Sequence, residues 1–273
     1  MDQLSLSPNL AIKNQSIGVA NSTYDFDTSG AVPVDGILGI GPVDLTRGSL
    51  SNKTETIPTV VDNLYSQGLI AENLISISFR PSANGSTSDK NGELSFGSVD
   101  GSKHVGSLTY VPITKQQPAG VHWGIDQSVR YDNKSILNST GGVIDSGSTL
   151  IYLASDAYDA YKVATGATLD STTGLLRIEP SAYDKLKNLD FVIGGETFTL
   201  VPNAQIWPRA LNTYIGGSND WVYLVVNDLG EPSGNGLDFI NGYAWMERFY
   251  TVYDGGANRM GFAKTSWTNA TTN

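Results

Sequence analysis

Short runs in which apolar and polar residues alternate recur along the chain, and this period of two is typical of half-buried β-strands. Clear examples are residues 74–79 (LISISF), 93–99 (ELSFGSV) and 107–113 (SLTYVPI). Residues 191–201 predict a hairpin that turns on Gly194 and Gly195, and residues 249–263 predict another around Gly255 and Gly256. The chain is therefore predicted to be an all-β protein, mainly antiparallel.

A few short helices are predicted between the strands. The candidate segments are residues 58–68, 155–166 and 181–189. The first begins at Pro58 and carries an apolar stripe of Val60, Val61, Leu64 and Tyr65. In the second, Ser155 is the predicted N-cap and Gly166 the predicted stop. All three read as packing elements.

The length suggests two lobes or one large β domain, because a core tends to split at about 250–300 residues. The least strand-like polar stretch near the middle is residues 113–123 (ITKQQPAGVHW). We place the predicted boundary there, which gives lobes of residues 1–114 and 115–273.

The charge balance narrows the choice of partners. With 17 Lys and Arg against 27 Asp and Glu, the net charge is -10, which repels nucleic acid and anionic membranes. No apolar run reaches the ~18 residues of a membrane span, and the first ten residues do not resemble a signal peptide. The chain has no Cys, which excludes disulfides and thiolate chemistry.

The most informative motif is VIDSGSTLIYL, residues 143–153, in which Asp145 lies on a Ser-Gly turn between two apolar runs. Gly147 allows the backbone to turn, and the hydroxyls of Ser146, Ser148 and Thr149 can hold the carboxylate. Two such acids facing each other share one proton and can activate a water between them. Taken alone, the motif is better explained as an ordinary Asp-Ser-Gly turn.

The order of motifs along almost the whole chain resembles the pepsin-like aspartic endopeptidases, most closely the polyporopepsin type of basidiomycete fungi. VIDSGSTLIYL is similar to the second active-site loop of that family. VDGILGIGP (34–42) and LDFINGYAWMERFYTVYD (237–254) are similar to the segments that lie beside the first and second loops. The resemblance implies a bilobal acid protease fold, here with an incomplete first lobe.

The first active-site acid of the family pattern is not apparent in the sequence. Asp145 and Gly242 are 97 positions apart (242 − 145), and the same spacing before Gly39 falls about 58 positions before Met1 (39 − 97). The nearest lookalike, residues 27–30 (DTSG), has one residue too many and polar flanks, so it is predicted to be a hairpin tip.

The resemblance also implies an activity and site residues. The protein is expected to be an aspartic endopeptidase that cuts peptides at acid pH with no metal or cofactor, and Asp145 to be its second catalytic acid. Ser146, Gly147 and Ser148 would support the loop. Substrate would contact Gly147, Ser148, Thr149 and Ile37. Asn241 departs from the family, which usually has Leu there.

Three physical situations remain open for one chain with one such acid. It is the heavy chain of a two-chain protease, whose separate N-terminal chain supplies the first Asp; or a truncated non-catalytic peptide-binding or interaction protein; or a self-paired dimer. In each case the expected ligand is a peptide or protein, with no nucleic acid and no membrane. The isolated chain is expected to be inactive.

Two further residue types bear on location and metal chemistry. The only histidines, His104 and His122, lack a second ligand at metal spacing, so no metal site is predicted. Asn-x-Ser/Thr sequons suit a secreted, extracellular glycoprotein whose signal peptide is not in this chain. They lie at Asn14, Asn21, Asn52, Asn84, Asn133, Asn138 and Asn269.

Overall fold

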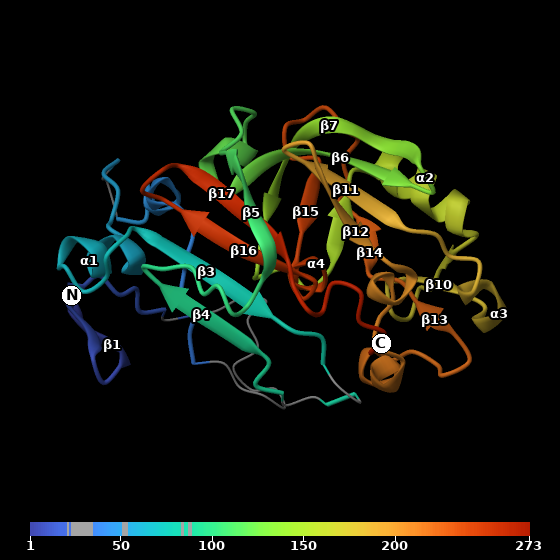
Figure 1. Cartoon of the computed structure of the whole chain (residues 1–273), viewed down its shortest axis with the longest axis horizontal. Coiled ribbons are helices and arrows are strands. Elements are labelled where there is room, and N and C mark those ends of the chain that lie inside the picture. Colours follow the sequence, from blue (N-terminus) through green and yellow to red (C-terminus); the bar gives the residue numbers. More distant parts are fainter. Residues whose placement is uncertain (21, 23–34, 51–53, 83–84, 87–88) are drawn as a thin grey trace. The chain divides into compact units, whose positions relative to one another are not determined.

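A computed structural model describes residues 1–20, 22, 35–50, 54–82, 85–86 and 89–273 (Figure 1). By its internal contacts the chain divides into a first unit, Met1–Asn73, and a second unit, Leu74–Asn273. No helix among the described residues is long and apolar enough to cross a membrane.

The first unit contains an antiparallel hairpin and short helices. Its elements are β1 (Asp2–Ser7), β2 (Leu10–Gln15), the 3-10 helix η1 (Val43–Thr46) and α1 (Val60–Ser66). The N-cap of α1 is Thr59, which accepts a hydrogen bond from Asp62 N while the Asp62 carboxylate accepts one from Thr59 N. At the other end, the Gln67 amide exchanges two hydrogen bonds with the main chain of Lys13, which fixes α1 to β2.

The described residues of the second unit form three sheets. The five-stranded sheet has the order β4-β3-β16-β17-β5, and in Figure 1 the red strands β16 and β17 lie between β3 and β5. Its bounds are β3 (Leu74–Phe79), β4 (Gly92–Phe96), β5 (Val105–Pro112), β16 (Phe249–Asp254) and β17 (Arg259–Lys264). A three-stranded sheet has the order β13-β10-β9, formed by β9 (Thr168–Leu169), β10 (Leu176–Ile178) and β13 (Val222–Tyr223).

The seven-stranded sheet has the order β12-β11-β6-β7-β15-β8-β14. Its bounds are β6 (Gly124–Tyr131), β7 (Lys134–Ile144), β8 (Ile151–Leu153), β11 (Leu189–Ile193), β12 (Glu196–Leu200), β14 (Val226–Asp228) and β15 (Phe239–Asn241). The late strand β15 lies between β7 and β8, parallel to the first and antiparallel to the second. The loop from β7 to β8 must therefore pass over the end of β15.

Short helices connect these strands. They are α2 (Ser155–Thr165), α3 (Pro180–Tyr183), α4 (Tyr243–Met246) and the 3-10 helices η2 (Ala119–Val121), η3 (Pro202–Gln205) and η4 (Arg209–Ile215). The α4 residue Trp245 is fully buried, with its ring 4.6 Å from that of Phe249 and 6.1 Å from that of Phe198. These rings come from β16 and β12, so Trp245 joins the two large sheets in one apolar core.

The predicted all-β fold with a few short helices is confirmed, and both predicted hairpins form. Three local predictions are wrong. Tyr65 is 50% exposed rather than part of the buried stripe. Ser155 is inside α2, and its hydroxyl donates a hydrogen bond to the Asp228 carboxylate instead of capping the helix. The third helix has only four residues, and Leu189, predicted as its last residue, instead lies in β11 and pairs with both β6 and β12.

The predicted lobe boundary between residues 114 and 115 stays a prediction. The contact-based division at Asn73 and Leu74 follows from strand pairing. Strands β3 and β5 pair with β16 and β17, which come from the end of the chain. This pairing groups residues 74–114 with the later part of the sequence.

Candidate active site

Asp145 directly follows β7 and opens the loop that leads over β15 to β8. The last five residues of β7 are all buried, as expected of a central strand. The N–H of Asp145 donates to Asn241 O at 3.1 Å, so the end of β15 fixes the start of the loop. Asp145 is therefore held on a buried scaffold while its own side chain is only half-buried.

The loop holds the Asp145 carboxylate through both of its oxygens. Gly147 N donates to Oδ1 at 2.9 Å, and Ser148 Oγ donates to Oδ2 at 2.7 Å. Ser148 N also donates to Asp145 O at 3.3 Å, which closes the turn. A Cβ atom on Gly147 would lie 3.2 Å from Oδ1 and crowd the carboxylate. The carboxylate is thus positioned at the tip of a tight turn, with Gly147 and Thr149 exposed beside it.

The far side of the loop is bound by the start of α4. Tyr243 N donates to Ser148 O at 2.7 Å, and Ala244 N donates to Thr149 O at 3.0 Å. A Cβ atom on Gly242 would overlap the carbonyl oxygens of Leu150 and Ser148, so glycine is required for this close approach. Helix α4 therefore uses its free N-terminal N–H groups to hold the site loop.

An aromatic pair lies beneath the loop. The rings of Trp123 and Tyr253 stack with centroids 5.2 Å apart, and Tyr253 Oη donates to Ile144 O at 3.4 Å. Burial raises the pKa of Tyr253, and the nearby charge of Asp145 raises it further. The hydroxyl therefore stays protonated and remains a donor beside the loop.

Asn241, where the resemblance leads one to expect Leu, is fully buried and paired with Gln127. Gln127 Nε2 donates to Asn241 Oδ1 at 3.2 Å, and Asn241 Nδ2 donates to Gln127 Oε1 at 2.8 Å. The packing of β15 is therefore maintained by two reciprocal hydrogen bonds between the two side-chain amides. Gln127 was not predicted as a partner of Asn241; the only signal for it in the sequence is a polar residue at an inward position of the 124–131 strand.

We predict that Asn241→Leu lowers the free energy of unfolding by about 1–3 kcal/mol, because the Gln127 amide is then buried without a partner. The double variant Asn241→Leu/Gln127→Leu should recover part of this loss, because both polar groups are removed. Urea unfolding of the wild-type chain, both single variants and the double variant measures the coupling. Additive losses in the double variant would contradict the amide pair.

The structure describes Ile37 in the first unit, where its side chain is 80% exposed. With Leu38 and Gly39 it lines a cavity of about 690 Å³ within that unit. Its predicted role in substrate binding stays a prediction. The structure brings the other predicted residues, Asp145 to Thr149, together in one loop. Among the described residues Ser146 Oγ has no hydrogen-bond partner, and its supporting role stays a prediction. The lookalike at residues 27–30 lies outside the described residues.

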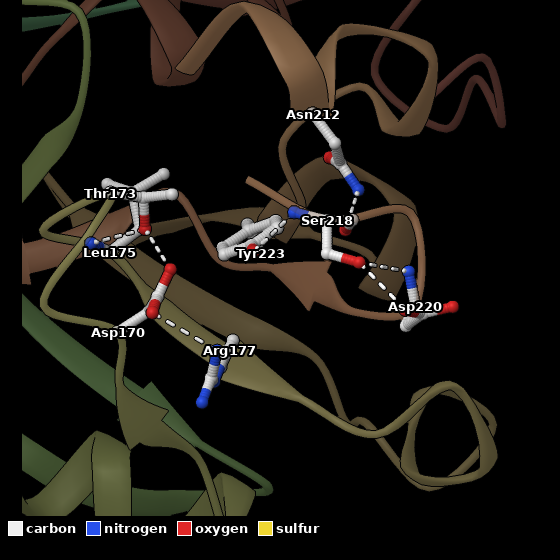
Figure 2. Close-up of polar contacts among 8 residues, drawn as sticks. All are labelled: Asp170, Thr173, Leu175, Arg177, Asn212, Ser218, Asp220 and Tyr223. Carbon is white, nitrogen blue, oxygen red and sulfur yellow. Dashed lines mark hydrogen bonds and ion pairs between the residues drawn. The ribbon is translucent and has the colours of Figure 1, made fainter. Parts of the chain in front are cut away.

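Other polar clusters in the second unit serve structural contacts. Figure 2 shows Asp170 between Thr173 and Arg177, with the Asp170 carboxylate accepting from Thr173 Oγ1 at 3.0 Å and from Arg177 Nη1 at 3.1 Å. Arg177 also lies 4.1 Å from the ring centre of Trp221. These contacts fix the turn between β9 and β10 to β10 and pair the Asp170 carboxylate with a guanidinium. The part of the chain that the structure describes contains no group of three or more potential metal ligands.

A family model described as eukaryotic aspartyl protease matches residues 1–265. Polyporopepsin of Irpex lacteus is 57% identical over 266 residues, which is 97% of this chain and 76% of polyporopepsin. Pepsin B of Canis lupus familiaris is 29% identical over 265 residues, and the chain spans 61% of its length. The crystal structure of the aspartic proteinase from Irpex lacteus superposes with a TM-score of 0.92 at 56% identity, covering 97% of this chain and 77% of that one.

Proposed function

The chain belongs to the eukaryotic aspartyl proteases and has the pepsin-like fold, and from this premise we propose that Asp145 is the second catalytic acid of a peptide hydrolase. The observation that carries the proposal is the Asp145 turn: Gly147 N and Ser148 Oγ hold the carboxylate at a half-exposed tip beside the threaded strand β15. Such a geometry suits a carboxyl that faces another across a bound water.

The chemistry needs one ionised and one protonated carboxyl. The ionised carboxyl takes a proton from the water while the water oxygen attacks the scissile carbonyl. The protonated carboxyl donates its proton to the carbonyl oxygen. The carboxyl that took the proton from the water then gives it to the amide nitrogen as the C–N bond breaks, and the other carboxylate takes a proton back from the hydrated carbonyl, which releases the two products. Because two adjacent carboxyls cannot both ionise readily, the shared proton is retained at acid pH, and no metal or cofactor is required.

Asp145 supplies one of these two carboxyls. The hydrogen bonds that its carboxylate accepts come from its own loop. We propose that the partner acid is carried by a first-lobe segment, as in the heavy chain of a two-chain protease. In the first unit, the exposed Ile37 and Leu38 line the 690 Å³ cavity, and such a segment would cover them. A non-catalytic peptide-binding protein is the second candidate.

We also propose that the protein is a secreted glycoprotein that acts on extracellular peptides or proteins. Four of the predicted sequons are described by the structure, and all four asparagines are exposed. They are Asn14, Asn133, Asn138 and Asn269. The asparagines of the other three, Asn21, Asn52 and Asn84, lie outside the described residues.

The test is a digestion of denatured casein between about pH 3 and 5, where a carboxyl pair holds its shared proton. Residues 1–273 by themselves are predicted to show no pepstatin-sensitive hydrolysis, because one carboxyl cannot form the pair. Adding a first-lobe segment of polyporopepsin with its Asp-Thr/Ser-Gly loop should restore inhibitable hydrolysis. Polyporopepsin itself is the positive control.

Inhibitable turnover by a pure monomer of residues 1–273 would contradict the one-carboxyl argument. The same turnover confined to a dimer fraction in size-exclusion chromatography would favour two copies paired through Asp145. Saturable peptide binding without hydrolysis, even after complementation, would favour the non-catalytic candidate.

A further inference from the structure

The C-terminal segment carries an exposed tryptophan two positions before a sequon. The sequon is Asn269-Ala270-Thr271, and Trp267 precedes it. Ala270 N donates to Trp267 O at 3.0 Å, which closes a β-turn with Trp267 at its first position and Asn269 at its third. The first and fourth Cα atoms of a β-turn lie less than ~7 Å apart. A sugar joined to Asn269 Nδ2 therefore starts close to Trp267.

Hydrogen bonds from within the protein fix this turn. Thr265 N donates to Thr268 Oγ1 at 2.9 Å, and Thr268 Oγ1 donates to Arg248 O at 2.7 Å. The buried Arg248 guanidinium donates to the carbonyl of Trp267. Thr268 is 4% exposed, whereas Trp267 before it and Asn269 after it are both exposed. The turn thus directs Thr268 inward and presents the other two side chains to solvent.

The space beside the tryptophan is open and polar. Trp267 is 36% exposed and borders a cavity of about 320 Å³, whose lining includes Arg80, Lys90 and Glu93. The face of an indole ring is electron-rich and attracts positively polarised C–H groups. A pyranose has a face of such C–H groups and carries its hydroxyls at the edge. An apolar ring in polar surroundings therefore suits a sugar.

We propose that Asn269 carries an N-linked glycan and that its first N-acetylglucosamine packs on the exposed face of Trp267. The inference rests on the proposed secretion of the protein, because N-linked glycans belong to secreted chains. The donor is a polyprenyl-diphosphate-linked oligosaccharide. A bond forms between Asn269 Nδ2 and the anomeric carbon, the bond from that carbon to the diphosphate breaks, and Nδ2 gives up one proton to solvent. The packed sugar covers apolar surface only in the folded turn, so it stabilises the C-terminal segment.

Asn133 is a matched comparison for Asn269. It too has an aromatic residue two positions earlier, Tyr131. Tyr131 is only 4% exposed, and its Oη accepts a hydrogen bond from Lys187 N. A glycan on Asn133 therefore has no aromatic face to cover. The same spacing in the sequence should give a stabilising glycan at Asn269 and a neutral one at Asn133.

The test uses residues 1–273 secreted from a fungal host behind a supplied signal peptide. Peptide mass mapping should find Asn269 glycosylated. Thr271→Ala abolishes this sequon but keeps Asn269 and Trp267, and it should lower the midpoint of thermal unfolding by about 2–4 °C. Enzymatic trimming of the wild-type glycans to a single N-acetylglucosamine should leave the midpoint unchanged. Asn133→Gly removes the comparison sequon, keeps the positive φ of that position and should also leave the midpoint unchanged.

Two further measurements test the contact itself. In a Trp267→Leu background, Thr271→Ala should change the midpoint by less than about 1 °C. In the wild type, the ring protons of the first sugar on Asn269 should resonate upfield of those on Asn133 in NMR spectra, because they lie over the indole ring.

An unmodified Asn269 would overturn the inference. An equal loss from Thr271→Ala with and without the Trp267 ring, or sugar proton signals alike at both sites, would overturn it as well. Glycans at other sequons with none at Asn269 would leave the glycoprotein proposal standing, whereas no glycan at any sequon would contradict both. None of these outcomes depends on peptidase activity.

Discussion

Asp145→Asn is expected to reduce the peptidase activity of the complemented protein by at least about a thousandfold, because an amide can neither accept the proton of the water nor share one with the partner acid. The fold should be unaffected. The asparagine Oδ1 can still accept from Gly147 N, and its Nδ2 can donate to Ser148 Oγ with the direction of the bond reversed. Casein hydrolysis and circular dichroism measure the two properties.

The matched control is Asp190→Asn on β11. Its carboxylate also accepts a hydroxyl hydrogen bond, from Thr199, but it lies outside the site loop. This variant should keep full activity. If Asp145→Asn retained activity with an unchanged spectrum, Asp145 would be a structural turn residue and the proposed function would be wrong.

The strands could be predicted from the sequence where one face of the sheet is buried. The hairpin that turns on Gly194 and Gly195 is of this kind, since the residues of β11 alternate between buried and half-buried. The run at residues 74–79 forms β3 within the predicted limits, although Leu74 to Ile77 are all buried instead of alternating. Such patterns are local, because the alternation of side chains belongs to the strand itself. The order of strands in a sheet is not local. The insertion of β15 between β7 and β8 joins segments nearly a hundred residues apart, and only the family resemblance indicated it.

Errors arose where a distant partner decides the role of a polar residue. Ser155 is a good N-cap by type, yet its hydroxyl bonds Asp228, 73 positions away. Asn241 departs from the Leu that is usual in the family, and the partner that pairs its buried amide is Gln127, 114 positions earlier. The Asp145 turn was more predictable, because Gly147 and Ser148 bind the carboxylate from within the same loop.

Arg248, two residues beyond α4, holds the C-terminal segment. Arg248 is fully buried, and its Nη1 donates to Trp267 O at 3.2 Å and Ala270 O at 2.8 Å. Its own carbonyl accepts from Thr265 Oγ1 and Thr268 Oγ1. The same guanidinium leaves Nε and Nη2 without acceptors among the described residues, and burial lowers its pKa. Arg248 therefore combines good packing and two hydrogen bonds from Nη1 with a large cost of desolvating its charge.

Arg248→Ala is expected to lower the free energy of unfolding by about 3–5 kcal/mol, because it leaves a large cavity under the C-terminal segment. Arg248→Met should cost far less, since methionine fills much of the same volume and removes the two unpaired donors along with the charge. The carbonyls of Trp267 and Ala270 lie in the terminal segment, where water can replace Nη1. Guanidinium unfolding of the three proteins at one pH gives the order. If both variants lost equal stability, the hydrogen bonds of Arg248 rather than its volume would hold the segment.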